Sequence, residues 1–139
     1  MVIRVRLQSG PIDTAAELSS AGSLEDGAVL GFIGTVRNHS GGKKVRGLYY
    51  EAYDSMAQRE IERIAGEASK RWSLTNCIVV HRTGTVEAGQ ASILIAVSSH
   101  HRDEGFEALR FIIDSIKKTV PIWKKELYAD GSAWISEHP

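Results

Sequence analysis

An amphipathic helix that ends at a proline is the feature that most constrains how this chain folds. Pro121 disfavours helix at the residue before it, so the chain must continue in extended form. In extended chain alternate side chains share a face, which puts Lys124 and Glu126 on one side. On the helix, Lys117 lies roughly 80° from the centre of the apolar stripe, at its border, whereas Lys118 lies nearly opposite. The apolar residues that recur with helical period are Phe106, Leu109, Ile112, Ile113, Ile116 and Val120.

Strand and helix patterns alternate along the rest of the chain. We expect strands at residues 2–7, 28–36, 45–53, 77–82, 91–99, 122–128 and 133–135, and helices at 14–21 and 103–120. A further helix, capped by Asp54 or Ser55, carries a helical repeat up to Trp72. The mostly apolar segment 28–36 is expected to be a central strand. Residues 37–44 read as a mobile loop, and Asp130-Gly131 as a turn between strands.

These patterns predict a single α+β domain spanning residues 1–139. Adjacent strands with two substantial helices suggest a mainly antiparallel sheet with a small additional β subdomain, rather than a regular doubly wound sheet. The 17 basic and 17 acidic residues balance, which argues against a general nucleic-acid binder. No apolar run approaches the ~20 residues that span a bilayer. A single cysteine argues against intrachain disulfides and favours the cytoplasm.

Two local clusters are candidates for binding an anion. Arg37 follows a buried-looking strand and can fork onto a phosphate or carboxylate, although a surface arginine beside a turn is the alternative. His101 and Arg102 precede a long helix, whose N-terminus attracts anions. There the alternative is that Ser99 or Asp103 simply caps the helix.

Neither a metal site nor a covalent nucleophile is expected. Five scattered histidines and one cysteine show no paired ligand spacing for zinc. Cys77 precedes an apolar strand and reads as a small buried residue without a basic neighbour in the sequence. The chemistry is therefore expected from lysines, an arginine and a histidine. The tyrosines at 49, 50 and 53 are explained by packing.

Taken together, the motifs resemble the large, catalytic subunit of molybdopterin synthase. The matching segments are, in order, 31–37, 45–57, 101–108 and 117–126, and the similarity extends from residue 2 to residue 135. The resemblance implies an α/β hammerhead fold and a homodimer, each end carrying a small ubiquitin-like sulfur-carrier subunit. That carrier's C-terminal Gly-Gly tail, as a thiocarboxylate, would supply two sulfurs to cyclic pyranopterin monophosphate and form the dithiolene of molybdopterin. No cofactor is implied.

The resemblance also assigns roles by position. Lys117 and Lys124 look like the catalytic lysines, and Arg37, His101 and Arg102 like the anchors of substrate phosphate and pterin. Phe32 would pack the channel for the carrier's tail, and Glu126 would orient Lys124. Some relatives complete the neighbouring pocket with a basic residue near the C-terminus, for which His138 is the candidate here.

Two other functions fit parts of the sequence. A non-catalytic anion- or nucleotide-binding module would use Arg37 and Arg102 without a carrier. A weaker idea is RNA binding through the tyrosines together with Lys43 and Lys44.

Overall fold

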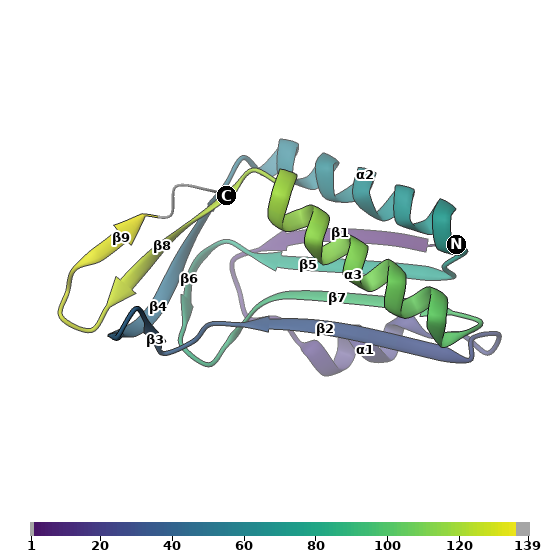
Figure 1. The fold of residues 1–139 in the computed structure, drawn as a ribbon, viewed down its shortest axis with the longest axis horizontal. Coiled ribbons are helices and arrows are strands. Elements are labelled where there is room, and N and C mark those ends of the chain that lie inside the picture. Colours follow the sequence, from purple (N-terminus) through teal and green to yellow (C-terminus); the bar gives the residue numbers. More distant parts are fainter. Residues whose placement is uncertain (1, 136–139) are drawn as a thin grey trace.

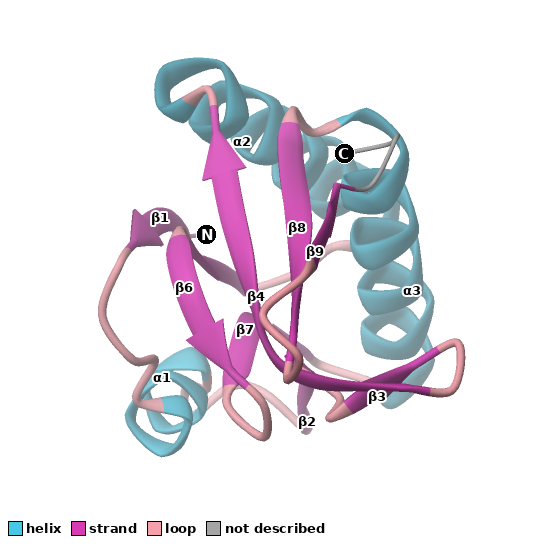
Figure 2. Ribbon diagram, turned by 90° about the vertical axis from the view of Figure 1, so that its left-hand side faces the viewer, coloured by secondary structure: helices cyan, strands magenta, loops and turns pink. Residues whose placement is uncertain are grey.

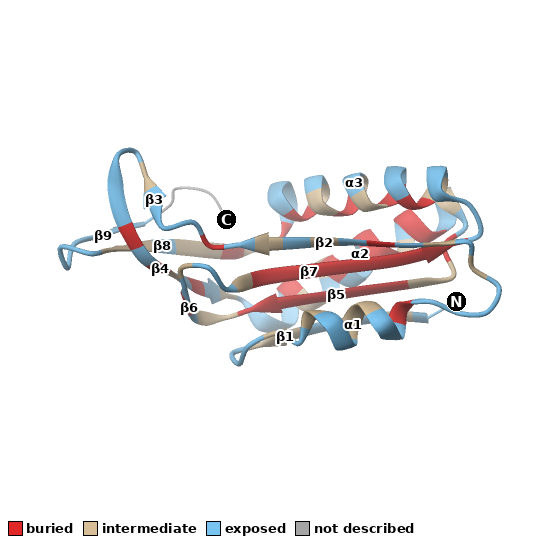
Figure 3. Ribbon diagram, turned by 90° about the horizontal axis from the view of Figure 1, so that it is seen from below, coloured by how far each residue is buried: buried red, intermediate tan, exposed pale blue. Residues whose placement is uncertain are grey.

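The main sheet has four strands in the order β1, β5, β7, β2. The structure, a computed structural model, describes residues 2–135, so the expectation about His138 lies outside the described residues. β1 (Val2–Gln8) runs parallel to β5 (Asn76–Arg82), whereas β7 (Ala91–Ser99) is antiparallel to both β5 and β2 (Ala28–Thr35). β5 and β7 are buried along almost their whole length, as their continuous apolar runs require of central strands (Figure 3).

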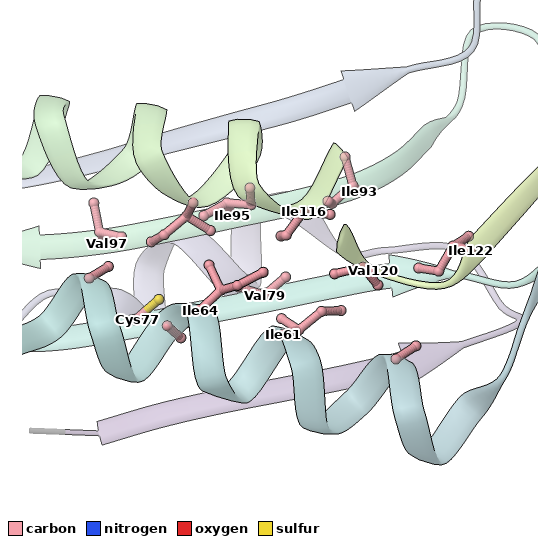
Figure 4. Packing of buried hydrophobic residues seen from close by; sticks show 14 of the residues in the cluster. Ile61, Ile64, Cys77, Val79, Ile93, Ile95, Val97, Ile116, Val120 and Ile122 are labelled. Atoms are coloured by element: carbon pink, nitrogen blue, oxygen red, sulfur yellow. The ribbon is translucent and has the colours of Figure 1, made fainter. Parts of the chain in front are cut away.

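Helices cover the two faces of this sheet unequally (Figure 1). α2 (Asp54–Trp72) and α3 (Arg102–Thr119) pack side by side on one face, and the short α1 (Thr14–Ala21) lies on the other. The larger core lies between α2, α3 and the sheet, where Ile61, Ile64 and Val79 are fully buried (Figure 4). Burying apolar side chains of this size contributes about 1.5–3 kcal/mol each.

A second, curved sheet extends from one end of the first (Figure 1) and faces the viewer in Figure 2. Its long strand β4 (Lys43–Ala52) pairs antiparallel with β8 (Ile122–Tyr128), which in turn pairs with β9 (Ala133–Ile135). β3 (His39–Ser40) and β6 (Gly84–Glu87) also pair with β4. The α+β class with a mainly antiparallel sheet and an additional β unit is confirmed.

The break at Pro121 falls where the sequence placed it. α3 ends at Thr119, and Val120 is already extended at φ −80° and ψ 129°. The Tyr53 N–H donates to the Pro121 carbonyl at 3.3 Å, which ties the start of β8 to the end of β4. The β8–β9 hairpin is also confirmed, with Gly131 at φ 90° as its turn demands.

The expected central position of residues 28–36 was wrong. β2 is an edge strand, paired only with β7 in the described part of the chain. Leu30 is buried beneath α3, but Val29 and Ile33 on the opposite face are 47% and 40% exposed. α1 reaches that face at Gly31, where a β-carbon would collide with Leu18. The short α1 covers too little of β2 to bury its apolar residues.

Two local expectations also need correction, and one strand is present that the sequence did not predict. Residues 37–44 are not one loop: β3 and β4 form a tight hairpin in which Gly41 and Gly42 take φ 55° and 81°, as a type I′ turn requires. The connection between β5 and β7 contains a strand, β6, which leaves the main sheet to pair with β4. α2 has Tyr53 as its N-cap with no side-chain hydrogen bond, so neither Asp54 nor Ser55 caps it.

Helices long and apolar enough to cross a membrane are absent from the part of the chain that the structure describes.

Candidate active site

A cavity of about 220 Å³ opens where the end of α3 meets both sheets. Five of the seven predicted site residues line it: Phe32, Arg37, Lys117, Lys124 and Glu126. They come from β2, the segment after it, α3 and β8. Its remaining walls come mainly from β2, β4 and β7, with Gly34, Thr35, His39, Ser40, Val45, Leu48, Tyr50, Ser92 and Ile93.

The bend at Pro121 and the register of β8 bring the two lysines together. Lys117 lies in the last turn of α3, and Lys124 is the third residue of β8. β8 pairs with β4 so that Lys124 lies opposite Tyr50 and Glu126 opposite Leu48. Directly opposed residues share one face of a sheet, so all these side chains face the cavity. A second cavity of about 60 Å³ is also lined by both lysines and by Tyr50.

The electrostatics of the site act on Lys117. Its pKa is lowered, first because its ammonium group is partly removed from water and second because of the positive charge of Lys124. Lys117 as a whole residue is nevertheless exposed at the surface. A lysine with a lowered pKa has more of its neutral amine at working pH, which suits it to accept and return a proton.

Glu126 is held by hydroxyl groups rather than by a lysine. The Ser40 hydroxyl donates to one carboxylate oxygen at 3.2 Å, and the Tyr128 hydroxyl donates to the other at 2.6 Å. No ion pair within 4.0 Å joins Glu126 to Lys124 in residues 2–135. Lys124 therefore lines the cavity without a salt bridge to Glu126, and the orienting role predicted for Glu126 is not made by direct pairing here.

The other two predicted residues lie elsewhere in this chain. His101 is the N-cap of α3 and Arg102 its first residue, and both are exposed. Since α3 rises about 1.5 Å per residue, Arg102 is about 22 Å along the helix from Lys117. Neither Ser99 nor Asp103 caps the helix by a side-chain hydrogen bond; the Ser99 hydroxyl donates to the His101 carbonyl instead.

Several cavity residues were missed by the sequence reasoning. Tyr50 was ascribed to packing, but it lines both cavities and is 9% exposed. Tyr50 and Leu48 are two residues apart in a predicted strand, so their side chains were expected to share one face, and this was a signal available in the sequence. His81 lines the smaller cavity, and its place within an apolar run, where histidine is unusual, was the corresponding signal. His39 and Ser40 reach the larger cavity only because of the β3–β4 hairpin.

Cys77 is a core residue, as predicted. It is fully buried on β5, and burial raises the pKa of its thiol to about 12. A thiol in that state is a poor nucleophile. Groups of three or more histidine, cysteine or acidic side chains placed to hold a metal ion are absent from residues 2–135.

These features define an α+β protein with a cavity lined by two lysines and an arginine, a set of side chains that suits an anionic ligand, and without a thiol in its wall. The MoaE protein family matches residues 7–119, and the chain belongs to that family. The molybdopterin synthase catalytic subunit of Bacillus subtilis (strain 168) is 40% identical over 134 residues, covering 96% of this chain and 85% of the relative. The family predicted from the sequence motifs is thus confirmed, as is an enzyme of molybdenum cofactor biosynthesis.

Solved structures agree with this assignment. Molybdopterin synthase from Staphylococcus aureus superposes with a TM-score of 0.89 at 36% identity, covering 95% of this chain and 96% of the other. The complex of subunits 1 and 2 of the molybdopterin-converting factor from Helicobacter pylori 26695 contains a chain that matches with a TM-score of 0.81. That match, at 24% identity over 97% of this chain and 93% of the other, supports the fold alone.

Proposed function

We propose that this subunit transfers two sulfur atoms, one at a time, from the C-terminal thiocarboxylate of a small carrier protein to cyclic pyranopterin monophosphate. The product is the dithiolene of molybdopterin. The observation that carries the proposal is the convergence of Lys117 and Lys124 on one open cavity. Membership of the MoaE family supplies the reaction class.

The two lysines divide the work according to their surroundings. Lys117, whose pKa is lowered, is the group that accepts and returns protons as sulfur is transferred. Lys124, with no ion-pair partner among residues 2–135, is free to pair with the thiocarboxylate and to stabilise developing negative charge. Sulfur arrives on the carrier, so the buried Cys77 has no part in the reaction.

The shape of the cavity suits a narrow peptide terminus. Phe32, Leu48 and Ile93 provide apolar walls, between which a Gly-Gly tail without side chains can extend toward the lysines. Arg37 stands in the same cavity and can form charge-assisted hydrogen bonds with a phosphate, each worth about 1.5–3 kcal/mol. The sulfur carrier is thus proposed as an obligatory partner.

A second copy of the chain is proposed to complete the site. The cavity, at about 220 Å³, is smaller than the roughly 300–1,000 Å³ of ordinary ligand pockets. His101 and Arg102 are exposed and lie at the far end of α3 from the lysines. In a symmetric homodimer these side chains can reach the cavity of the other subunit and anchor the pterin and its phosphate. The buried, unpaired cysteine is compatible with a cytoplasmic site of action.

The decisive experiment is a single-turnover assay with thiocarboxylated carrier and cyclic pyranopterin monophosphate. Lys117→Ala should reduce product formation by about 100-fold or more, the usual contribution of a positioned acid or base. Binding of the carrier should persist. Lys118→Ala, next in sequence but on the exposed side of α3, is the matched control and should retain activity. Lost carrier binding with intact chemistry in the remaining complex would contradict the role of Lys117.

No observation favours the alternative of an anion-binding module built on Arg37 and Arg102. Arg37 lines the cavity, whereas Arg102 is not among the residues that line it.

A further inference from the structure

His81 is a buried histidine beside the catalytic lysines that the proposed reaction leaves unused. It is the last but one residue of β5 and is only 7% exposed. Its Nδ1 lies 2.7 Å from the carbonyl oxygen of Arg82. A carbonyl oxygen only accepts hydrogen bonds, so Nδ1 carries the proton, and Nε2 of the neutral ring is left as an acceptor.

Nε2 of His81 is open to the smaller cavity. Within residues 2–135 the ring makes a hydrogen bond through Nδ1 and none through Nε2. Every fully buried side-chain nitrogen or oxygen in that range has a hydrogen-bond partner. Nε2 therefore retains accessible surface, and the 60 Å³ cavity is the space that His81 lines. The ring is fixed by edge-to-face packing on Tyr50, with centroids 5.1 Å apart and planes at 78°.

The size and lining of this cavity suit one or two water molecules. Each water occupies about 30 Å³ and needs two to four polar partners. The polar residues of the cavity wall are Tyr50, His81, Lys117 and Lys124. Three of these can donate to a water, and only His81 presents a nitrogen that must accept.

We propose that His81 is a positioning residue for Lys117, holding its ammonium group through a water that donates to His81 Nε2. The inference rests on the proposed function of the site. Without such an acceptor, the charge of Lys124 would push the ammonium group of Lys117 out toward solvent. Burial lowers the pKa of His81 to about 4, so the ring remains a neutral acceptor at neutral pH.

Other groups also face this region and contribute to the charge that Lys117 experiences. β4 presents Tyr50 and β8 presents Lys124 and Glu126, while Arg37 comes from the segment after β2 and His39 from β3. All of these remain unchanged when His81 is replaced, so the effect of His81 can be measured separately.

A matched pair of substitutions separates the two nitrogens of the ring. His81→Asn keeps a donor near the position of Nδ1 for the Arg82 carbonyl but removes the acceptor in the cavity. His81→Gln places an acceptor near the position of Nε2 and removes the donor. The readouts are the pKa of Lys117, followed by NMR of isotope-labelled lysine in the protein alone, and kcat and KM in the complete synthase.

The two variants should differ in a defined direction. A hydrogen bond to the ammonium form favours that form, so His81→Asn should lower the pKa of Lys117 by about half a unit and kcat by about tenfold. KM and carrier affinity should not change. His81→Gln should stay close to the unsubstituted protein in both readouts. Equal effects of both variants, or a normal His81→Asn protein, would overturn the proposal in favour of a packing role.

Should either variant fail to fold, nitrogen NMR of the unsubstituted protein gives the answer. The spectrum should show protonated Nδ1 and bare Nε2 on His81, with the Nε2 shift following the titration of Lys117. In Lys117→Met that pH-dependent shift should disappear. A proton on Nε2, or a shift indifferent to Lys117, would refute the inference. These measurements need neither carrier nor pterin, so they remain valid even if the proposed reaction is wrong.

Discussion

Lys117 and Lys124 line the same two cavities from opposite sides of the Pro121 bend, and the charge of Lys124 contributes to lowering the pKa of Lys117. Removing a cationic neighbour favours the charged form of a lysine. Lys124→Met should therefore raise the pKa of Lys117 toward its ordinary value of 10.5. NMR titration of labelled lysine checks this. Lys125→Met, which removes an equal charge from the exposed side of β8, should leave Lys117 unchanged; an equal shift in both variants would mean that only net charge matters.

Arg37 should act on substrate affinity rather than on the chemical step. Losing a charge-assisted hydrogen bond of about 1.5–3 kcal/mol corresponds to a roughly 10- to 150-fold rise in KM for the pyranopterin in Arg37→Ala. kcat measured at saturating substrate should change much less. Steady-state kinetics with thiocarboxylated carrier test this, with Arg46→Ala as control, since Arg46 is exposed on β4 and is not part of the cavity wall. A fall in kcat at constant KM would place Arg37 in the chemistry instead.

Activity should be recovered by mixing two inactive subunits if the site is shared between copies. Lys117→Ala and Arg102→Ala each disable every site of their own homodimer. In a mixed dimer one site carries both substitutions and the other carries neither. Random mixing in equal amounts makes about half of the dimers mixed, so about a quarter of the original activity should return. Coexpression and a turnover assay measure it. No recovery would mean that both residues act within one chain.

Stability should depend on pH through His81. Burial lowers its pKa from 6.5 to about 4. Between these two pH values the imidazole is protonated in the unfolded chain and neutral in the folded chain. Stability is then lost as the pH falls through that window, by about 1.5 kcal/mol between pH 6.5 and pH 5. Guanidinium unfolding at several pH values measures this. His81→Gln, which does not titrate, should flatten the slope in this range; an unchanged slope would assign it to other groups.

The local elements could be predicted largely from the sequence because their signals are local. The periodicity of α3, the stop at Pro121 and the Asp130-Gly131 turn depend on neighbouring residues, and the structure places all three as predicted. The edge position of β2 could not be found this way. A run of apolar residues is compatible with both a central and an edge strand. The position of such a strand depends on which strands pair with it and which helices cover it.

The residues of the site also fall into those that local sequence predicts and those that only tertiary contacts bring together. The sequence by itself determined the cationic and carboxylate side chains that flank Pro121, through the helical and extended periods on either side of it. Only the tertiary structure decided that Arg37 joins them, that His81 stands behind them, and that His101 and Arg102 lie at the other end of α3. The reason is physical. Periodicity determines the direction of a side chain relative to its own helix or strand. Strand register and helix packing depend on contacts between distant segments, and they determine which other side chains it contacts.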